Sequence, residues 1–321
     1  MKKPAGNRII IMKDSFGREI RYLRISVTQR CNLHCAYCGA AAPAEEELSP
    51  DTLALLAAGF AREGIRKIRL TGGEPLVRTD IAEIAAKIKY AAAPDILGIT
   101  TNGLLLAQKA TALRAAGVDA VNVSLDSLDA SCYRKLTGRD ALSPVLDGIE
   151  TALSLGFDRV RINAVLIRGV NETGAEKLIG LAKAYPLDVR FIELMPFSDA
   201  GEDPRLRIPS AEILSMFPFL YPTGETDGTA VYYTAHGFRG KIGLISPITK
   251  KFCGSCDRVR LLSDGRVKPC LGQPETYELL PFINDPEALR EAIRNAILRK
   301  PAGHRFEDPN THSHALNRIG G

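Results

Sequence analysis

The feature that most constrains the fold is a regular alternation of strand-like and helix-like segments over the first two-thirds of the chain. The segments between most of the strand-like runs carry helical patterns, with start signals such as the capping serine and proline of Ser49-Pro50-Asp51. Strands separated by helices favour parallel βαβ units with right-handed crossovers. Apolar, β-branched runs predict strands at Leu23–Val27, Ile68–Leu70, Ile96–Thr100, Ala120–Leu125, Val160–Ile167 and Val189–Leu194. Six such units predict an α/β fold, a partial (β/α)6 barrel of the TIM type.

The last third of the chain has a different character. Residues 197–230 are rich in proline, glycine and acidic side chains and predict a long connection. Two short strand-like runs follow, at Ala230–Thr234 and Lys241–Ile245, and Pro281–Leu298 predicts a helix. A loose polar tail is expected from His304 onward. We therefore expect a barrel in residues 1–196 and a C-terminal extension in residues 197–321.

Composition excludes several classes of protein. Of the 321 residues, 45% are hydrophobic and 25% are charged, which is typical of a globular chain and not of a disordered one. The net charge of +5 is spread without a block of like charge, so nucleic acid is not an expected partner. Apolar runs are too short for a membrane span or a secretory signal. We expect a cytoplasmic protein.

The cysteines fall into two groups of three, with Cys132 apart from both. Cys31, Cys35 and Cys38 follow the first predicted strand with the spacing Cys-x3-Cys-x2-Cys. Three thiolates can hold three irons of a [4Fe–4S] cube and leave the fourth iron open. The alternative is zinc, which prefers four ligands and would need His34 from between the cysteines. The ligand number and spacing favour the cluster.

The second group consists of Cys253, Cys256 and Cys270, with the spacing Cys-x2-Cys-x13-Cys. A structural zinc site would again need a fourth ligand. The nearest upstream histidine is His236, and the next one downstream is His304. We therefore favour a second cluster with an open iron. If the following segment is extended, Arg258 and Arg260 lie on one face of it.

Polar residues stand at the carboxyl ends of several predicted strands, where barrel enzymes carry their active sites. They include Thr71-Gly72-Gly73-Glu74-Pro75, Thr100-Thr101-Asn102-Gly103, Ser124-Leu125-Asp126 and Glu193-Leu194-Met195. Each could also be an ordinary turn at a strand end. Bare backbone at the two glycines permits close approach, and Glu74 offers a carboxylate to an ammonium group. Together the segments predict a site at this end of the barrel.

Cations interrupt strands that should otherwise be apolar. Lys67 and Arg69 alternate on one strand, and Arg24, Arg161 and Arg190 interrupt or flank others. Buried cations are costly unless they are paired, and these strands carry too few acids to pair them all. A polyanion such as a triphosphate would supply the missing charge. Alternatively, the cations lie on the helix-facing surface and reach water.

The first cysteine spacing is that of the radical S-adenosylmethionine superfamily, and Gly72-Gly73-Glu74-Pro75 resembles that superfamily's methionine-binding motif. The second cysteine group makes the resemblance more specific. With Leu23–Thr28, Arg69–Leu76, Arg190–Met195 and the terminal Ile319-Gly320-Gly321, the chain resembles the GTP 3′,8-cyclase family of molybdenum cofactor biosynthesis over nearly its whole length.

The resemblance implies that the first cluster cleaves S-adenosylmethionine and that the second binds the guanine of GTP. It further implies abstraction of the ribose 3′ hydrogen and ring closure at guanine C8, giving (8S)-3′,8-cyclo-7,8-dihydroguanosine 5′-triphosphate. By resemblance, S-adenosylmethionine contacts fall on Tyr37, Gly73, Ser124 and Met195. GTP contacts fall on Arg24, Lys67, Arg69, Thr100, Arg161, Arg190, Arg258 and Arg260, while Gly320 and Gly321 form a tail that enters the active site.

Two positions depart from the family pattern. Arg161 stands where a lysine is expected, which preserves the charge but changes the geometry. Asp257 stands where Asn or Thr is commoner and places a carboxylate beside the second cysteine group.

The resemblance also implies partners. These are a reductant such as flavodoxin or ferredoxin and a downstream cyclic pyranopterin monophosphate synthase; a homodimer is left open. The main rival is another radical enzyme with an auxiliary cluster, such as a peptide maturase, although those usually carry more C-terminal cysteines. A non-catalytic zinc protein that binds nucleic acid is a second rival, and the mild net charge argues against it.

Overall fold

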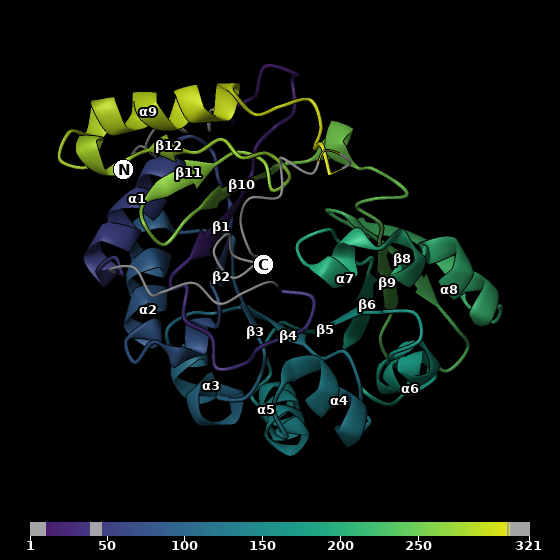
Figure 1. Ribbon diagram of the computed structural model, residues 1–321. Coiled ribbons are helices and arrows are strands. Elements are labelled where there is room, and N and C mark those ends of the chain that lie inside the picture. The colour runs from purple at the N-terminus through teal and green to yellow at the C-terminus, as the bar shows by residue number, and fades with distance from the viewer. Residues whose placement is uncertain (1–10, 39–46, 307, 309–321) are drawn as a thin grey trace, which may run out of the picture.

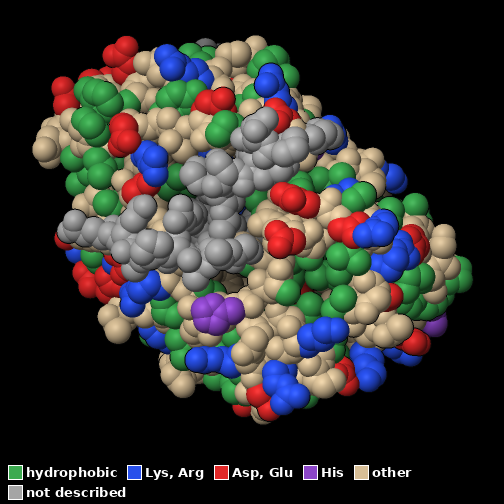
Figure 2. All heavy atoms as spheres, viewed as in Figure 1, with side chains coloured by type: hydrophobic (Ala, Val, Ile, Leu, Met, Phe, Trp, Pro, Cys, Tyr) green, Lys and Arg blue, Asp and Glu red, His purple; other side chains and the backbone are tan. Residues whose placement is uncertain are grey.

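The computed structural model describes residues 11–38, 47–306 and 308. Its strands form one curled sheet of twelve strands in the order β12-β11-β10-β1-β2-β3-β4-β5-β6-β9-β8-β7 (Figure 1). No helix within the described ranges is long and apolar enough to cross a membrane. On the face shown in Figure 2, acidic and basic side chains are interspersed.

The centre of the sheet is the predicted partial barrel. Adjacent strands from β1 to β6 are parallel, and helices cover their outer face (Figure 1). The strands are β1 (Tyr22–Ser26), β2 (Lys67–Thr71), β3 (Ile96–Thr101), β4 (Ala120–Ser124), β5 (Arg159–Val165) and β6 (Asp188–Ile192). The helices are α1 (Pro50–Arg62), α2 (Ile81–Ala92), α3 (Leu106–Ala115), α4 (Ala130–Thr137), α5 (Leu142–Ser154) and α6 (Ala175–Ala184). The prediction of the barrel is confirmed, although α4 was not expected.

Alternation along the strands explains why the barrel has an apolar exterior and a polar interior. In β1, the side chains of Leu23 and Ile25 are fully buried in the main hydrophobic core, and Arg24 between them lines a cavity. Successive side chains of a strand point to opposite faces. The apolar side chains therefore pack against the surrounding helices, and the side chains that alternate with them face the interior of the barrel.

The C-terminal region extends the same sheet at both edges. At one edge β9 (Ile242–Ile245) runs parallel to β6 and continues into β8 (Ala230–Thr234) and β7 (Tyr221–Asp227). At the other edge β10 (Arg258–Leu261) runs parallel to β1 and continues into β11 (Arg266–Lys268) and β12 (Tyr277–Glu278). Helix α9 (Pro286–Leu298) packs on α1 (Figure 1). The two regions of the sequence therefore share one sheet.

Two local predictions are wrong. The segment 197–230 contains α7 (Asp199–Glu202), α8 (Ser210–Met216) and β7 and is not a plain connection. Most β7 side chains are exposed, so this strand has no apolar alternation to reveal it. The start of the expected loose tail is also ordered. Phe306 is buried and its ring contacts those of Phe197 and His304, at 5.5 and 4.2 Å between centroids.

Candidate active site

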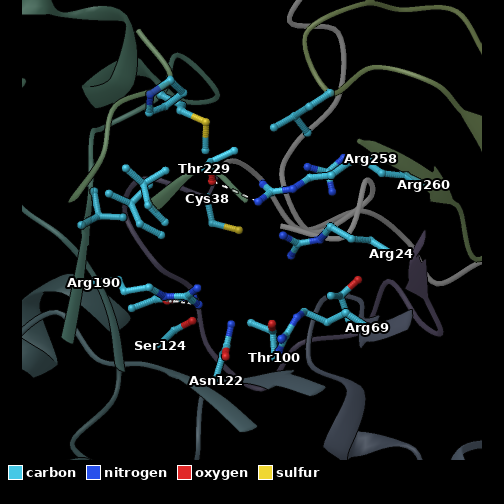
Figure 3. Close-up of a pocket in the computed structure, with 18 of the residues that line it drawn as sticks. Arg24, Cys38, Arg69, Thr100, Asn122, Ser124, Arg190, Thr229, Arg258 and Arg260 are labelled. Atoms are coloured by element: carbon cyan, nitrogen blue, oxygen red, sulfur yellow. Dashed lines mark hydrogen bonds between the residues drawn. The ribbon is translucent and has the colours of Figure 1, made fainter. Parts of the chain in front are cut away.

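A cavity of about 310 Å³ lies inside the curled sheet, and both cysteine groups line it. The strand-borne cations face this interior, which excludes their placement on the helix-covered surface. The cavity brings together the predicted residues Tyr37, Gly73, Ser124, Met195, Arg24, Lys67, Arg69, Thr100, Arg161, Arg190, Arg258, Arg260 and all six grouped cysteines. Figure 3 labels some of them, among them Arg24, Ser124 and Cys38. The predicted tail glycines, Gly320 and Gly321, lie outside the described residues.

The first cysteine group, Cys31, Cys35 and Cys38, lies on the loop after β1. Helix α4 holds this loop, because the backbone N–H groups of His34 and Ala36 donate to carbonyl oxygens at its end, at 3.0 and 2.9 Å. Burial raises the pKa of Cys31 and of Cys35. Buried thiolates need compensating positive charge, so this donor set fits an iron–sulfur cluster.

Gly72 and Gly73 permit a close approach to the chain's own backbone. An added Cβ would lie 2.5 Å from the Thr28 carbonyl oxygen at Gly72 and 2.4 Å from the Arg30 carbonyl oxygen at Gly73. The Gly73 N–H donates to the Thr28 carbonyl at 2.8 Å. The two glycines therefore allow the loops after β1 and β2 to pack together at the cavity wall.

Glu74 joins the loops that follow β2 and β3. Its buried carboxylate accepts hydrogen bonds from the N–H groups of Leu76 and Asn102, at 2.9 and 2.6 Å, and from the Thr101 hydroxyl at 2.7 Å. Burial raises the pKa of Glu74 to about 7, against the effect of these donors. The carboxylate that we expected to face an ammonium group thus also fixes two loops of the site.

Tyr37 is anchored by a carboxylate at the end of β4. Its hydroxyl donates to Asp126 at 2.6 Å, and the other Asp126 oxygen accepts from the Val165 N–H at 2.7 Å. Burial raises the pKa of Asp126 to about 6. This chain of contacts ties the first cysteine loop to β4 and β5.

The second cysteine group lies beside β10. Cys253 and Cys256 flank a short turn before that strand, and Cys270 follows β11. The Arg18 guanidinium donates to the Cys253 carbonyl oxygen at 2.7 Å and braces the turn. A hydrogen bond from His304 lowers the pKa of Cys253. His304 therefore belongs to the site, although we had expected it in a loose tail.

The number of thiols in each group bears on the choice between iron and zinc. Among the residues that the structure describes, no group of three or more Cys, His, Asp and Glu side chains is arranged to hold a metal ion. In a cluster each thiolate binds a different iron, so the thiolates surround a larger object than one ion. Three thiols at each group match the ligand number of a cluster with one open iron, whereas a structural zinc site needs a fourth ligand.

Like charges are crowded in the cavity. Arg24, Arg69, Arg258 and Arg260 lie along one side of it, and Arg190 lies across from them (Figure 3). Burial, together with neighbouring cations, lowers the pKa of Arg190 and that of Arg260 to about 10. A nearby anion would stabilise the charged form of these two guanidinium groups, so a polyanionic ligand fits the cavity.

Several buried polar atoms in the described part of the cavity lack a hydrogen-bond partner. They include the Thr100 hydroxyl, the Asn122 side-chain amide oxygen, the Arg258 Nε and one Arg260 side-chain nitrogen. Leaving such groups unpaired costs about 1–3 kcal/mol each. A polar ligand that pairs them would recover this free energy.

Tyr22 lies among these cations. Its hydroxyl accepts a hydrogen bond from the Arg69 Nε at 2.7 Å, and the Lys67 ammonium lies 4.9 Å from the ring centroid. Burial raises the pKa of Tyr22, but Arg69, Arg24 and other cations outweigh it and bring the pKa down to about 7.

We expect one tyrosine of the ligand-free protein to ionise near pH 7, as measured by ultraviolet difference absorbance. Tyr22→Phe should remove this transition. Inorganic tripolyphosphate should move it to higher pH, because bound phosphates neutralise the cations that stabilise the phenolate. A tyrosine titration that starts only near pH 10 would contradict this expectation.

The sequence interpretation missed several cavity residues. Asn122 and Asn163 are polar residues within buried strands, so the reasoning that identified the cations could have found them. The Asn163 side chain accepts two hydrogen bonds from Arg190, at 2.8 and 3.0 Å. Asp227 and Thr229 come from a segment expected to be a connection, and the sequence carries no signal for them.

Comparison with known proteins identifies two family matches. Residues 25–182 match the radical SAM superfamily, and residues 187–306 match the Molybdenum Cofactor Synthesis C family. Among solved structures, SuiB of Streptococcus suis bound to S-adenosylmethionine is similar, with a TM-score of 0.63 at 14% sequence identity. The match covers 92% of this chain and 73% of the SuiB chain. Methylornithine synthase has a TM-score of 0.51 at 19% identity and covers 63% of each chain. These structures show the shared fold.

Curated relatives match nearly the whole chain. The GTP 3′,8-cyclase of Alkaliphilus oremlandii is 42% identical over 97% of this chain and 100% of its own length. That of Geobacter sulfurreducens is 42% identical over 91% of this chain and 93% of its own. Molybdenum cofactor biosynthesis protein 1 of Drosophila melanogaster is 39% identical over 94% of this chain and 56% of its own. The chain belongs to the GTP 3′,8-cyclase family of the radical SAM superfamily.

Proposed function

We propose that this protein converts GTP into (8S)-3′,8-cyclo-7,8-dihydroguanosine 5′-triphosphate, the first step of molybdenum cofactor biosynthesis. The observation that carries the proposal is that two groups of three cysteines and a crowd of cations line the same cavity. One reaction chamber can therefore hold S-adenosylmethionine and a nucleoside triphosphate in contact. The curated relatives, which carry the name of this activity, support the same assignment.

The cysteine groups are assigned different tasks. Cys31, Cys35 and Cys38 would hold the cluster that, when bound, supplies the electron for cleavage of S-adenosylmethionine. Cys253, Cys256 and Cys270 would hold a second [4Fe–4S] cluster that receives the guanine. In this assignment residues 1–196 bind S-adenosylmethionine and residues 197–321 bind the guanine base. Both regions contribute strands to one continuous sheet.

The chain's own residues orient both substrates. Tyr37, Gly73, Ser124 and Met195 are assigned to S-adenosylmethionine; the first of these is fixed by Asp126. Guanidinium groups suit bidentate phosphate contacts. We assign the triphosphate and ribose of GTP to Arg24, Lys67, Arg69, Thr100, Arg161 and Arg190, and the region of the base to Arg258 and Arg260.

The activity also implies partners. Cleavage of S-adenosylmethionine needs an external one-electron donor such as flavodoxin or ferredoxin. The cyclised nucleotide would pass to a cyclic pyranopterin monophosphate synthase. Both would meet the protein in the cytoplasm.

The proposal is tested by anaerobic reconstitution with iron and sulfide, followed by incubation with GTP, S-adenosylmethionine and dithionite. Mass spectrometry and NMR should identify the cyclised triphosphate. Reactions without S-adenosylmethionine, or with ATP in place of GTP, are the controls. Formation of 5′-deoxyadenosine without any change in GTP would contradict the assigned substrate.

Arg69→Ala is expected to weaken GTP binding by about 1.5–3 kcal/mol, as for the loss of a charge-assisted hydrogen bond. S-adenosylmethionine binding should hardly change. Equilibrium dialysis of each ligand measures both effects. Arg168→Ala, which removes a surface ion pair with Glu212, is the matched control. Equal losses for both ligands would indicate misfolding and contradict a phosphate contact.

A further inference from the structure

The turn between β7 and β8 reaches into the cavity. Gly228 and Thr229 connect the paired residues Asp227 and Ala230, and both Asp227 and Thr229 line the cavity. Gly228 has a φ of +64°, and a Cβ added there would lie 2.9 Å from a terminal nitrogen of Arg258. The backbone conformation therefore favours glycine, and the turn lies close to the end of the Arg258 side chain.

This turn contacts cations from three separate strands. The Asp227 carboxylate accepts hydrogen bonds from the Lys67 ammonium of β2 at 3.1 Å and from the Arg161 guanidinium of β5 at 2.6 Å. The Thr229 hydroxyl accepts from Arg258 of β10 at 3.0 Å (Figure 3). A single hairpin thus links to β2, β5 and β10 through polar contacts.

Asp227 is an anion at the place where the cations need one. Burial would raise its pKa, but Lys67 and Arg161 outweigh burial and hold the pKa of this carboxyl well below its usual range. Its side chain is about one-fifth exposed, at 21%, so it is not sealed into the core. Asp188 makes a longer contact with Arg161, at 3.4 Å, and belongs to β6 itself. Asp188 therefore belongs to the barrel wall, whereas Asp227 reaches these cations from the β7–β8 hairpin.

We propose that the Asp227 carboxylate lies within the polyphosphate site. It pairs with Lys67 and Arg161 before the nucleotide binds, and the phosphates of the nucleotide displace it from both cations. This inference rests on the proposed function for the identity of that nucleotide. A triphosphate carries several negative charges and accepts hydrogen bonds at more oxygens than one carboxylate does. It can therefore replace Asp227 at both cations, and the negative charge of Asp227 opposes its binding.

The test compares Asp227→Asn with the unaltered enzyme and with Glu225→Gln. Glu225 lies on the same strand, and its exposed carboxylate pairs with Lys241 at 2.6 Å, so the control changes the charge equally. Binding of inorganic tripolyphosphate, pyrophosphate and GTP is measured by calorimetry on reconstituted protein without S-adenosylmethionine or reductant.

Asp227→Asn is expected to bind tripolyphosphate about tenfold more tightly, because a like charge has been removed from the site. The gain should be smaller for pyrophosphate, and Glu225→Gln should leave all affinities unchanged. Unchanged or weaker tripolyphosphate binding by Asp227→Asn would overturn the proposal and leave Asp227 as a structural brace.

A second measurement needs no variant. Hydrogen exchange in the segment Tyr221–Thr234 of the unaltered protein should become faster when tripolyphosphate binds, because Asp227 loses its contacts with Lys67 and Arg161. Slower exchange there would contradict the displacement of Asp227. Tripolyphosphate binding does not depend on GTP being the substrate. An enzyme that cyclises GTP while Asp227→Asn gains no affinity would refute this inference alone.

Discussion

Cys35→Ala is expected to abolish the formation of 5′-deoxyadenosine, to the background level. The variant lacks one of three thiols on the loop after β1, so the cluster loses a ligand and the chemistry that it supplies. Iron content should fall by about half, because the second cysteine group is separate in the chain and remains intact. Iron analysis and chromatography of the nucleoside product measure both effects.

Cys132→Ala is the matched control, because Cys132 lies outside both groups. Its thiol contacts the Val170 carbonyl oxygen at 3.5 Å and does not line the cavity. This variant should keep its iron and its activity. Normal cleavage of S-adenosylmethionine by Cys35→Ala would remove the first group from the role assigned to it.

Cys256→Ala should separate the two halves of the reaction. The first cysteine group is unaltered, so some unproductive cleavage of S-adenosylmethionine should survive. GTP should not be converted, because the site assigned to its base has lost a ligand. Parallel assays of 5′-deoxyadenosine and of the cyclised triphosphate, on the same preparation, make this comparison. Cyclised product at the rate of the unaltered enzyme would show that the second group is not the site of the base.

The sequence predicts the barrel well because its strands carry a local signal. Runs such as Ile96–Thr100 and Ala120–Leu125 are apolar and β-branched, and parallel strands covered by helices need that composition. The cysteine groups have local signals too, in their spacing. The cations were recognisable because Arg69 and Arg161 interrupt buried strands, where an unpaired charge is costly.

Features that arise from contacts between distant segments could not be predicted. Lys67 and Asp227 are 160 positions apart, and nothing near Asp227 marks it as part of a site. Its strand, β7, contains Pro222 and Gly224 and is mostly exposed, so it lacks a strand pattern. His304 was likewise hidden, because its contact with the Pro247 carbonyl oxygen joins two irregular segments.

The pairing of β10 with β1 has a consequence for how the chain is made. Leu23 lies next to Val259 in the sheet, so the first strand gains its second neighbour only after most of the polypeptide has left the ribosome. Until then β1 presents an unpaired edge, which is prone to wrong association. Contacts so distant in the chain slow folding. Translation must therefore be nearly complete before the reaction chamber can close, and a nascent chain stalled before Arg258 would keep an open strand edge beside its first three metal-binding cysteines.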